Sequence, residues 1–64
     1  MNQVEAIKSL MKIMEQLRHR LKKLRLIKQS APEDMNTEIE QLIYEVEEII
    51  CKVEQELSRY VGIA

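Results

Sequence analysis

Apolar residues recur in both halves of the chain with the alternating three- and four-residue spacing of a heptad repeat. In the first half they occupy heptad positions a and d: Ile7, Leu10, Met14, Leu17, Leu21 and Leu24. In the second half, a is occupied by Ile39, Val46 and Val53, and d by Met35, Leu42 and Ile49. Strands would need alternation with a period of two, which neither half shows. The pattern predicts two amphipathic helices and an all-α fold.

Capping residues and the single proline mark the ends of these helices. Asn2 followed three residues later by Glu5 is typical of a capping box, and Ser30 followed by Glu33 repeats the device. Pro32 is tolerated in the first turn of a helix, where its missing N–H costs little. We therefore predict one helical-hairpin domain over residues 1–64, with helices at about 3–29 and 33–61 and a turn at 30–32.

The two helices are expected to fold back on each other as an antiparallel hairpin. When the chain is folded between Ala31 and Pro32, apolar a and d positions of the two helices face each other. The expected layers are Leu10–Val53, Met14–Ile49, Leu17–Val46, Leu21–Leu42 and Leu24–Ile39. The alternative is one long helix kinked at Pro32. The capping residues Ser30 and Glu33 lie at the point where the chain would fold back, which favours the hairpin. Gly62 is expected to end the second helix.

Further apolar residues lie beside this seam, so a lone hairpin would leave a broad apolar stripe in water. A chain of 64 residues is short for folding alone, and its single Cys excludes an internal disulfide framework. We expect two hairpins to dimerise into a four-helix bundle, with an isologous homodimer as the simplest symmetry. Another helical protein covering the same stripe is the alternative. The predicted interface residues are Val4, Met11, Ile13, Ile43, Ile50 and Leu57.

Charge is segregated between the two halves, although the formal net charge is only −1. Residues 1–31 carry eight Lys/Arg and two acidic residues, which gives +6, whereas residues 32–64 carry nine acidic residues and two Lys/Arg, which gives −7. The two halves should attract each other, with Arg20 near Glu45. The cluster of Lys and Arg residues in the first helix is also a candidate phosphate-binding face, although no aromatic residue lies among them to stack on a base. Its candidate residues are Arg18, Arg20, Lys22 and Lys23.

Patterns typical of catalysis and of metal or cofactor binding are missing from the sequence. Glu15 and His19 are spaced as two possible ligands, but the chain has one His and a catalytic zinc usually needs three protein ligands. No Glu-x-x-His motif of a di-iron bundle is present, and no serine has a His base nearby. A Gly-rich phosphate loop is also lacking. We therefore expect a non-enzymatic protein without a metal or a cofactor.

Tyr44 and Cys51 share position f of the second helix, which points away from the other helix. Because Tyr is enriched at binding hot spots, these two residues form a candidate patch for a protein partner. The unpaired thiol and the lack of a secretory signal pattern favour a cytoplasmic location. No apolar run reaches the roughly 18 residues of a membrane span, so we expect no membrane partner.

Two known families resemble the chain. In length and predicted architecture it resembles the Rop-type plasmid copy-number regulators, which implies RNA binding through the basic residues of the first helix. Residues 14–21 and 36–43 are similar to the two helices of the small aspartyl-phosphate phosphatases that act on response regulators. The Ser-x-x-Leu-Asp signature of that family is replaced here by Asn36, Ile39 and Glu40, so its activity is not carried over.

The leading hypothesis is a non-catalytic protein–protein interaction module. It would be a small adaptor, co-chaperone or regulator that docks onto another protein, or onto itself, through a helix face. The alternative is a Rop-like regulator that binds RNA or another nucleic acid through the basic face of the first helix.

Overall fold

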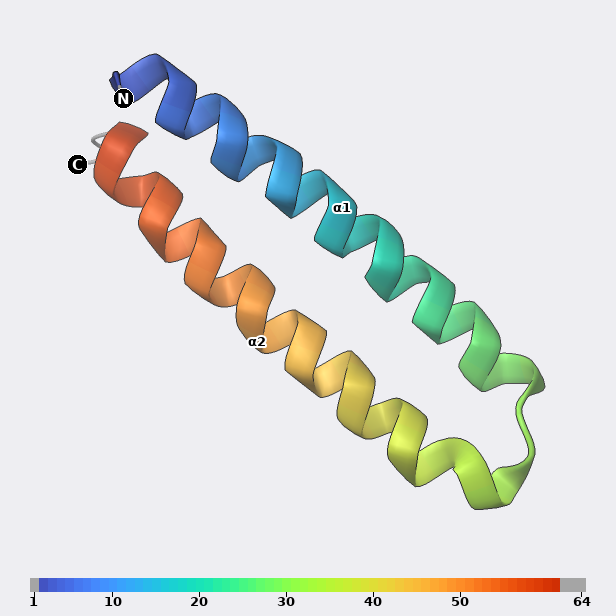
Figure 1. Ribbon diagram of the computed structural model, residues 1–64. Helices are drawn as coiled ribbons and strands as arrows, with labels where there is room; N and C mark the ends of the chain where they lie inside the picture. Colours follow the sequence, from blue (N-terminus) through green and yellow to red (C-terminus); the bar gives the residue numbers. More distant parts are fainter. Residues whose placement is uncertain (1, 62–64) are drawn as a thin grey trace.

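Two long helices packed against each other form the whole of the described fold (Figure 1). The computed structural model describes residues 2–61, and for residue 61 the backbone alone. Helix α1 (Gln3–Ser30) and helix α2 (Asn36–Val61) run antiparallel and are joined through a short 3₁₀ turn, η1 (Glu33–Met35). The molecule is a rod of 46 × 18 × 17 Å. The predicted two-helix hairpin is confirmed.

The start of α1 is capped as the sequence predicts. The side-chain Oδ1 of Asn2 accepts a hydrogen bond from the backbone N–H of Glu5 at 2.9 Å, which satisfies one of the free donors of the first turn. At the same end of the rod, the Gln3 side chain donates to the carbonyl oxygen of Tyr60 at 2.8 Å. This bond ties the first turn of α1 to the last turn of α2. The expected end of α2 at Gly62 lies outside the described residues.

The turn differs from the prediction. Ser30 is the last residue of α1, and its Oγ donates to the carbonyl oxygen of Ile27 at 3.4 Å, so the capping role expected for Ser30 is wrong. The cause is Pro32, which disfavours helical geometry in the preceding residue. Ala31 is accordingly extended, with φ −80° and ψ 151°. Pro32 precedes η1, and its carbonyl oxygen accepts from the N–H of Met35 at 3.0 Å.

The core is thin and consists of position-a residues. The buried hydrophobic side chains are Met14, Leu21, Ile39 and Val46. On α1, the d positions beside them are half-buried, as predicted. In the second half of the chain the apolar d residues are exposed: Met35 in η1 is 47% accessible, and Leu42 and Ile49 on α2 are 49% and 46% accessible. The e positions Ile43, Ile50 and Leu57 are half-buried instead. The expected layers Met14–Ile49 and Leu21–Leu42 are therefore wrong.

The difference is a rotation of α2 about its own axis, so that positions a and e face α1. Position b lies beside e on the helix surface, and this rotation brings the b glutamates to the arginines at position e of α1. Arg25 Nη2 lies 3.0 Å from Glu47 Oε2, and Arg18 Nη2 lies 3.5 Å from Glu54 Oε2. The a/d face predicted for α2 would have placed these glutamates farther from α1.

A pair of leucine substitutions on α1 tests this core. Leu21→Ala removes a side chain that is 9% exposed, and we expect it to lower the free energy of unfolding by about 2–4 kcal/mol. Leu26→Ala is the matched control, because Leu26 is 57% exposed, and its cost should stay below about 0.5–1 kcal/mol. Urea unfolding followed by circular dichroism measures both. Equal losses would contradict the burial of α1 described here.

Candidate functional site

The two long sides of the hairpin, on either flank of the seam between the helices, have different chemistry. One flank carries the e positions of α1 and the b positions of α2, and we name it the ion-pair side. Its ion pairs are Arg18–Glu54 at 3.5 Å, Arg25–Glu47 at 3.0 Å and Lys28–Glu40 at 3.2 Å. All these side chains are well exposed, so each pair contributes no more than about 1 kcal/mol to stability.

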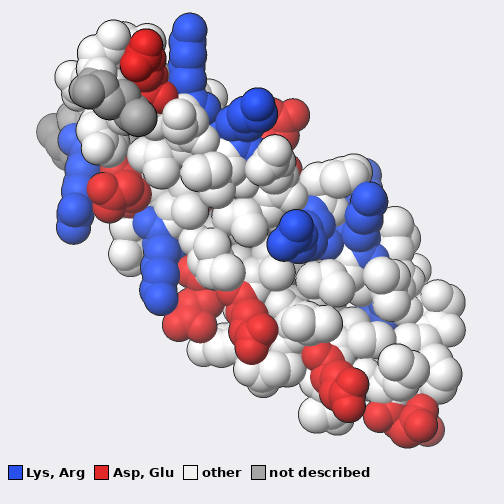
Figure 2. All heavy atoms as spheres, in the orientation of Figure 1, with Lys and Arg blue, Asp and Glu red and all other residues white. Residues whose placement is uncertain are grey.

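The opposite flank carries position g of α1 and position d of α2, and we name it the apolar side. It presents five large hydrophobic residues that are each 43–51% exposed: Ile13, Ile27, Met35, Leu42 and Ile49. Figure 2 shows an uncharged strip along the line between the helices; near the turn Lys and Arg lie toward α1 and Asp and Glu toward α2, whereas near the chain ends both charges occur on both helices. This exposed apolar strip is the candidate interaction surface of the hairpin.

Charged residues flank the apolar side. Arg20 shares position g with the two exposed isoleucines of α1, and Lys23 lies beside it at position c. On α2, position g next to the exposed d residues is occupied by Glu38 and Glu45 near the turn and by Lys52 and Arg59 toward the open end. Among residues 2–61, Arg20, Lys23, Glu38 and Glu45 take part in no intramolecular ion pair. Arg20 is therefore not paired with Glu45 within one hairpin, contrary to the sequence-based expectation.

The structure does not bring the predicted interface residues together on one surface. Ile13, 43% exposed, lies on the apolar side. Val4 and Met11 are 60% and 58% exposed, but as e residues of α1 they lie on the ion-pair side. The three remaining members, at position e of α2, are half-buried against α1: Ile43, Ile50 and Leu57.

Sequence reasoning missed Met35, Leu42 and Ile49 as surface residues because it assigned them to the core. A usable signal was present in the charges. Glutamates recur every seven residues at position b of α2, and arginines recur every seven residues at position e of α1: Glu40, Glu47, Glu54, Arg18 and Arg25. Two such complementary rows indicate which flanks of the helices meet.

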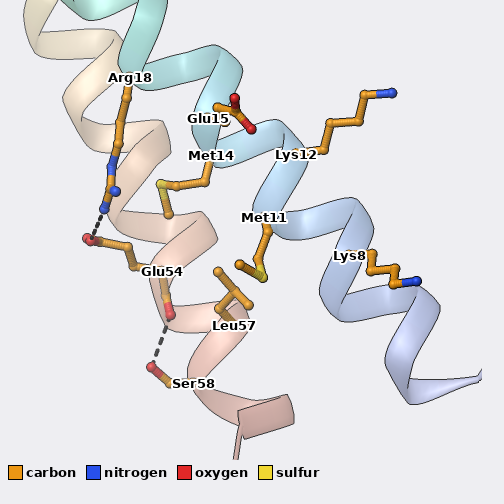
Figure 3. A pocket seen from close by; sticks show the side chains of 9 residues that line it. All are labelled: Lys8, Met11, Lys12, Met14, Glu15, Arg18, Glu54, Leu57 and Ser58. Atoms are coloured by element: carbon orange, nitrogen blue, oxygen red, sulfur yellow. Dashed lines mark hydrogen bonds and ion pairs between the residues drawn. The ribbon is translucent and has the colours of Figure 1, made fainter.

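A groove lies on the ion-pair side of the hairpin (Figure 3). Met11, Met14 and Leu57 line it with apolar atoms, and the Arg18–Glu54 pair lies across one end. The Ser58 Oγ at its edge donates to the Glu54 carbonyl oxygen at 3.0 Å, so this hydroxyl is used within the helix. Figure 3 shows the Lys8 side chain pointing away from the groove. The groove thus offers hydrophobic contact and no evident catalytic group.

The candidate partner patch lies on the outer face of α2. Tyr44 is 62% exposed, and Cys51 is an exposed free thiol two helical turns further on. Both residues share position f, which points away from α1, as the sequence predicts.

The candidate nucleic-acid residues do not share one face. Arg18 lies on the ion-pair side and is engaged by Glu54, and Lys22, at position b, is on the same flank. Arg20 and Lys23 lie on the flank of the apolar side. The four basic residues are therefore divided between the two flanks of the hairpin.

Within residues 2–61, no three His, Cys, Asp or Glu side chains converge as a metal site would require. Neither described helix combines the length and hydrophobicity needed to cross a bilayer. Comparison of the chain with protein-family models, with curated proteins and with solved structures gave no match. A function can therefore be inferred only from the surface chemistry of the hairpin.

A double-mutant cycle tests the ion-pair side. Arg25→Ala and Glu47→Ala, singly and together, should give a coupling energy of about 0.2–1 kcal/mol in urea unfolding, and 1 M NaCl should reduce it. The control cycle combines Arg20→Ala with Glu47→Ala, whose side chains lie on opposite flanks, and its coupling should be near zero. A larger coupling in the control cycle would contradict the assignment of flanks.

Proposed function

We propose that this chain is a non-catalytic protein–protein interaction module, a small cytoplasmic adaptor, co-chaperone or regulator that acts by helix-face docking. The observation that carries the proposal is the apolar side, with its five large hydrophobic residues exposed by 43–51%. Docking of an amphipathic helix or helix pair would cover this strip, and the charged residues along its edges would set the orientation of the partner.

The surface area of the hairpin supports association. Its accessible surface is 5375 Å², whereas a compact monomer of its mass, 7.6 kDa, has about 4,300 Å². The excess of roughly 1,000 Å² is comparable with the ~800 Å² that each partner buries in an interface of standard size. The radius of gyration is 14.8 Å, against about 11 Å for a compact domain of 64 residues. A second pair of helices on the apolar side, as in a four-helix bundle, would remove this excess.

Matched substitutions test the proposed docking surface. Leu42→Glu places a charge in the apolar side, and Leu26→Glu makes the same change on the outer face of α1. Each variant and the wild type are used as bait in affinity purification from the source cells, after circular dichroism has shown that they are helical. We expect proteins that are recovered with the wild type and with Leu26→Glu, but lost with Leu42→Glu. Identical recovery with all three baits would contradict the proposal.

Nucleic-acid binding is the second candidate function, and the unpaired basic residues of α1 favour it. Arg20, Lys22 and Lys23 are exposed and make no intramolecular ion pair among the described residues. They can therefore contact phosphates without breaking the hairpin.

Fluorescence anisotropy with a short RNA hairpin tests this second function. Affinity should fall steeply between 50 and 200 mM salt, by roughly tenfold or more if several phosphates are contacted. The double variant Lys22→Gln/Lys23→Gln should bind more weakly with a shallower salt dependence, whereas the control Lys52→Gln on α2 should match the wild type. Absence of binding at low salt, or an affinity independent of salt, would exclude this function.

A further inference from the structure

We infer that the apolar side is covered by a second copy of this chain, related by a two-fold axis parallel to the long axis of the hairpin. Both turns then lie at the same end of a four-helix bundle, and α1 of one copy packs against α2 of the other. The inference rests on the proposed function, because it names the partner of the same surface and the orientation in which that partner binds.

The charges beside the apolar side make this surface complementary to itself. In the half of the rod that contains the turn, Arg20 and Lys23 lie at its α1 edge and Glu38 and Glu45 at its α2 edge. Rotation by 180° about the long axis exchanges the two edges of the second copy. In that half of the rod, the basic residues of each copy therefore meet the acidic residues of the other, on both flanks of the interface.

The other face-to-face two-fold arrangement has its axis across the rod. It would stack α1 on α1 and α2 on α2, with the two turns at opposite ends. In this arrangement α2 would pair Glu45 with Lys52 and Glu38 with Arg59 of the other copy, because these residues share position g of two antiparallel helices. Arg20 and Lys23 would instead face the open-end half of the other α1, whose positions g and c carry no acidic residue. These two basic residues meet acidic residues of the second copy only when the axis is parallel to the rod, and that favours the parallel axis.

The positions of the individual charges along the rod agree with a two-fold axis parallel to it. The pairs Arg25–Glu47 and Lys28–Glu40 show which parts of the two helices lie at the same height along the rod. Arg20 and Lys23 on one helix, and Glu38 and Glu45 on the other, all belong to the half of the rod that contains the turn. A rotation about the long axis leaves heights unchanged, so these charges meet their opposites in the second copy.

Arg20 is the charged residue that most needs a partner of opposite charge in the second copy. It shares position g with Ile13 and Ile27, so any partner that covers the apolar side also covers the arginine. A charge that is removed from water without a counter-charge is strongly unfavourable. Glu38 and Glu45 of a second copy supply that counter-charge, and both are free of ion pairs among the described residues.

The position of the turns tests the topology directly. Cys51→Ser removes the native thiol, and Glu33→Cys or Glu5→Cys then places one spin label at the turn or at the open end. We expect a dimer by sedimentation, and double electron–electron resonance should give short distances for both labels, with backbones roughly 10–15 Å apart, as in a helix bundle. Distances near the rod length of 46 Å for both labels would overturn the topology.

Charge reversal tests the pairing across the interface. Arg20→Glu/Lys23→Glu and Glu38→Lys/Glu45→Lys should each weaken the homodimer roughly tenfold or more at low salt. An equimolar mixture of the two variants should form a heterodimer as tight as the wild type, because both flanks then join opposite charges. The control Lys22→Glu, on the other flank, should leave the dimer unchanged. If the Arg20→Glu/Lys23→Glu variant dimerises as tightly as the wild type, the inference is wrong.

The two proposals fail in different ways. If the wild type is a monomer up to millimolar concentration, but Leu42→Glu loses proteins that the wild type captures, the interaction function stands and the second copy is excluded. A wild-type monomer without any Leu42-dependent partner would contradict both proposals. A dimer that Leu42→Glu leaves intact would show that the apolar side is not the interface between copies.

Discussion

Two helices share only one seam, and this constraint governs the rest of the molecule. The second half of the chain has apolar residues at three heptad positions, a, d and e, whereas one neighbouring helix can cover only two of them. One set must remain at the surface. The hairpin turns positions a and e of α2 toward α1 and leaves Met35, Leu42 and Ile49 exposed, so the choice of edge creates the apolar side.

The charged residues of the two helices agree with the edge of α2 that faces α1. Each exposed ion pair is weak, but Glu40, Glu47 and Glu54 form one row along α2, and all three pair with cations of α1. The hydrophobic contribution of the two possible edges is similar, because both consist of large aliphatic residues. The three ion pairs therefore agree with the rotation of α2 that turns position e toward α1.

The same charges connect the fold with the proposed function. Pairs on the ion-pair side hold the hairpin together, whereas Arg20, Lys23, Glu38 and Glu45 make no such pair among the described residues and lie beside the apolar side. A hydrophobic strip supplies most of the affinity of an interface, and charges at its edges supply orientation. The proposed docking would therefore use both the hydrophobic strip and the charges beside it.

The sequence by itself determined the two helices, their antiparallel packing, the cap at Asn2 and the core of α1. Heptad spacing and capping residues act locally, and α1 has one dominant apolar edge that includes Met14 and Leu21. Only the tertiary structure decided that α2 turns Ile43 rather than Leu42 toward its neighbour, because periodicity cannot distinguish two apolar edges that are about 100° apart on one helix. The apolar side is a consequence of that rotation, and so its residues could not be read from spacing alone.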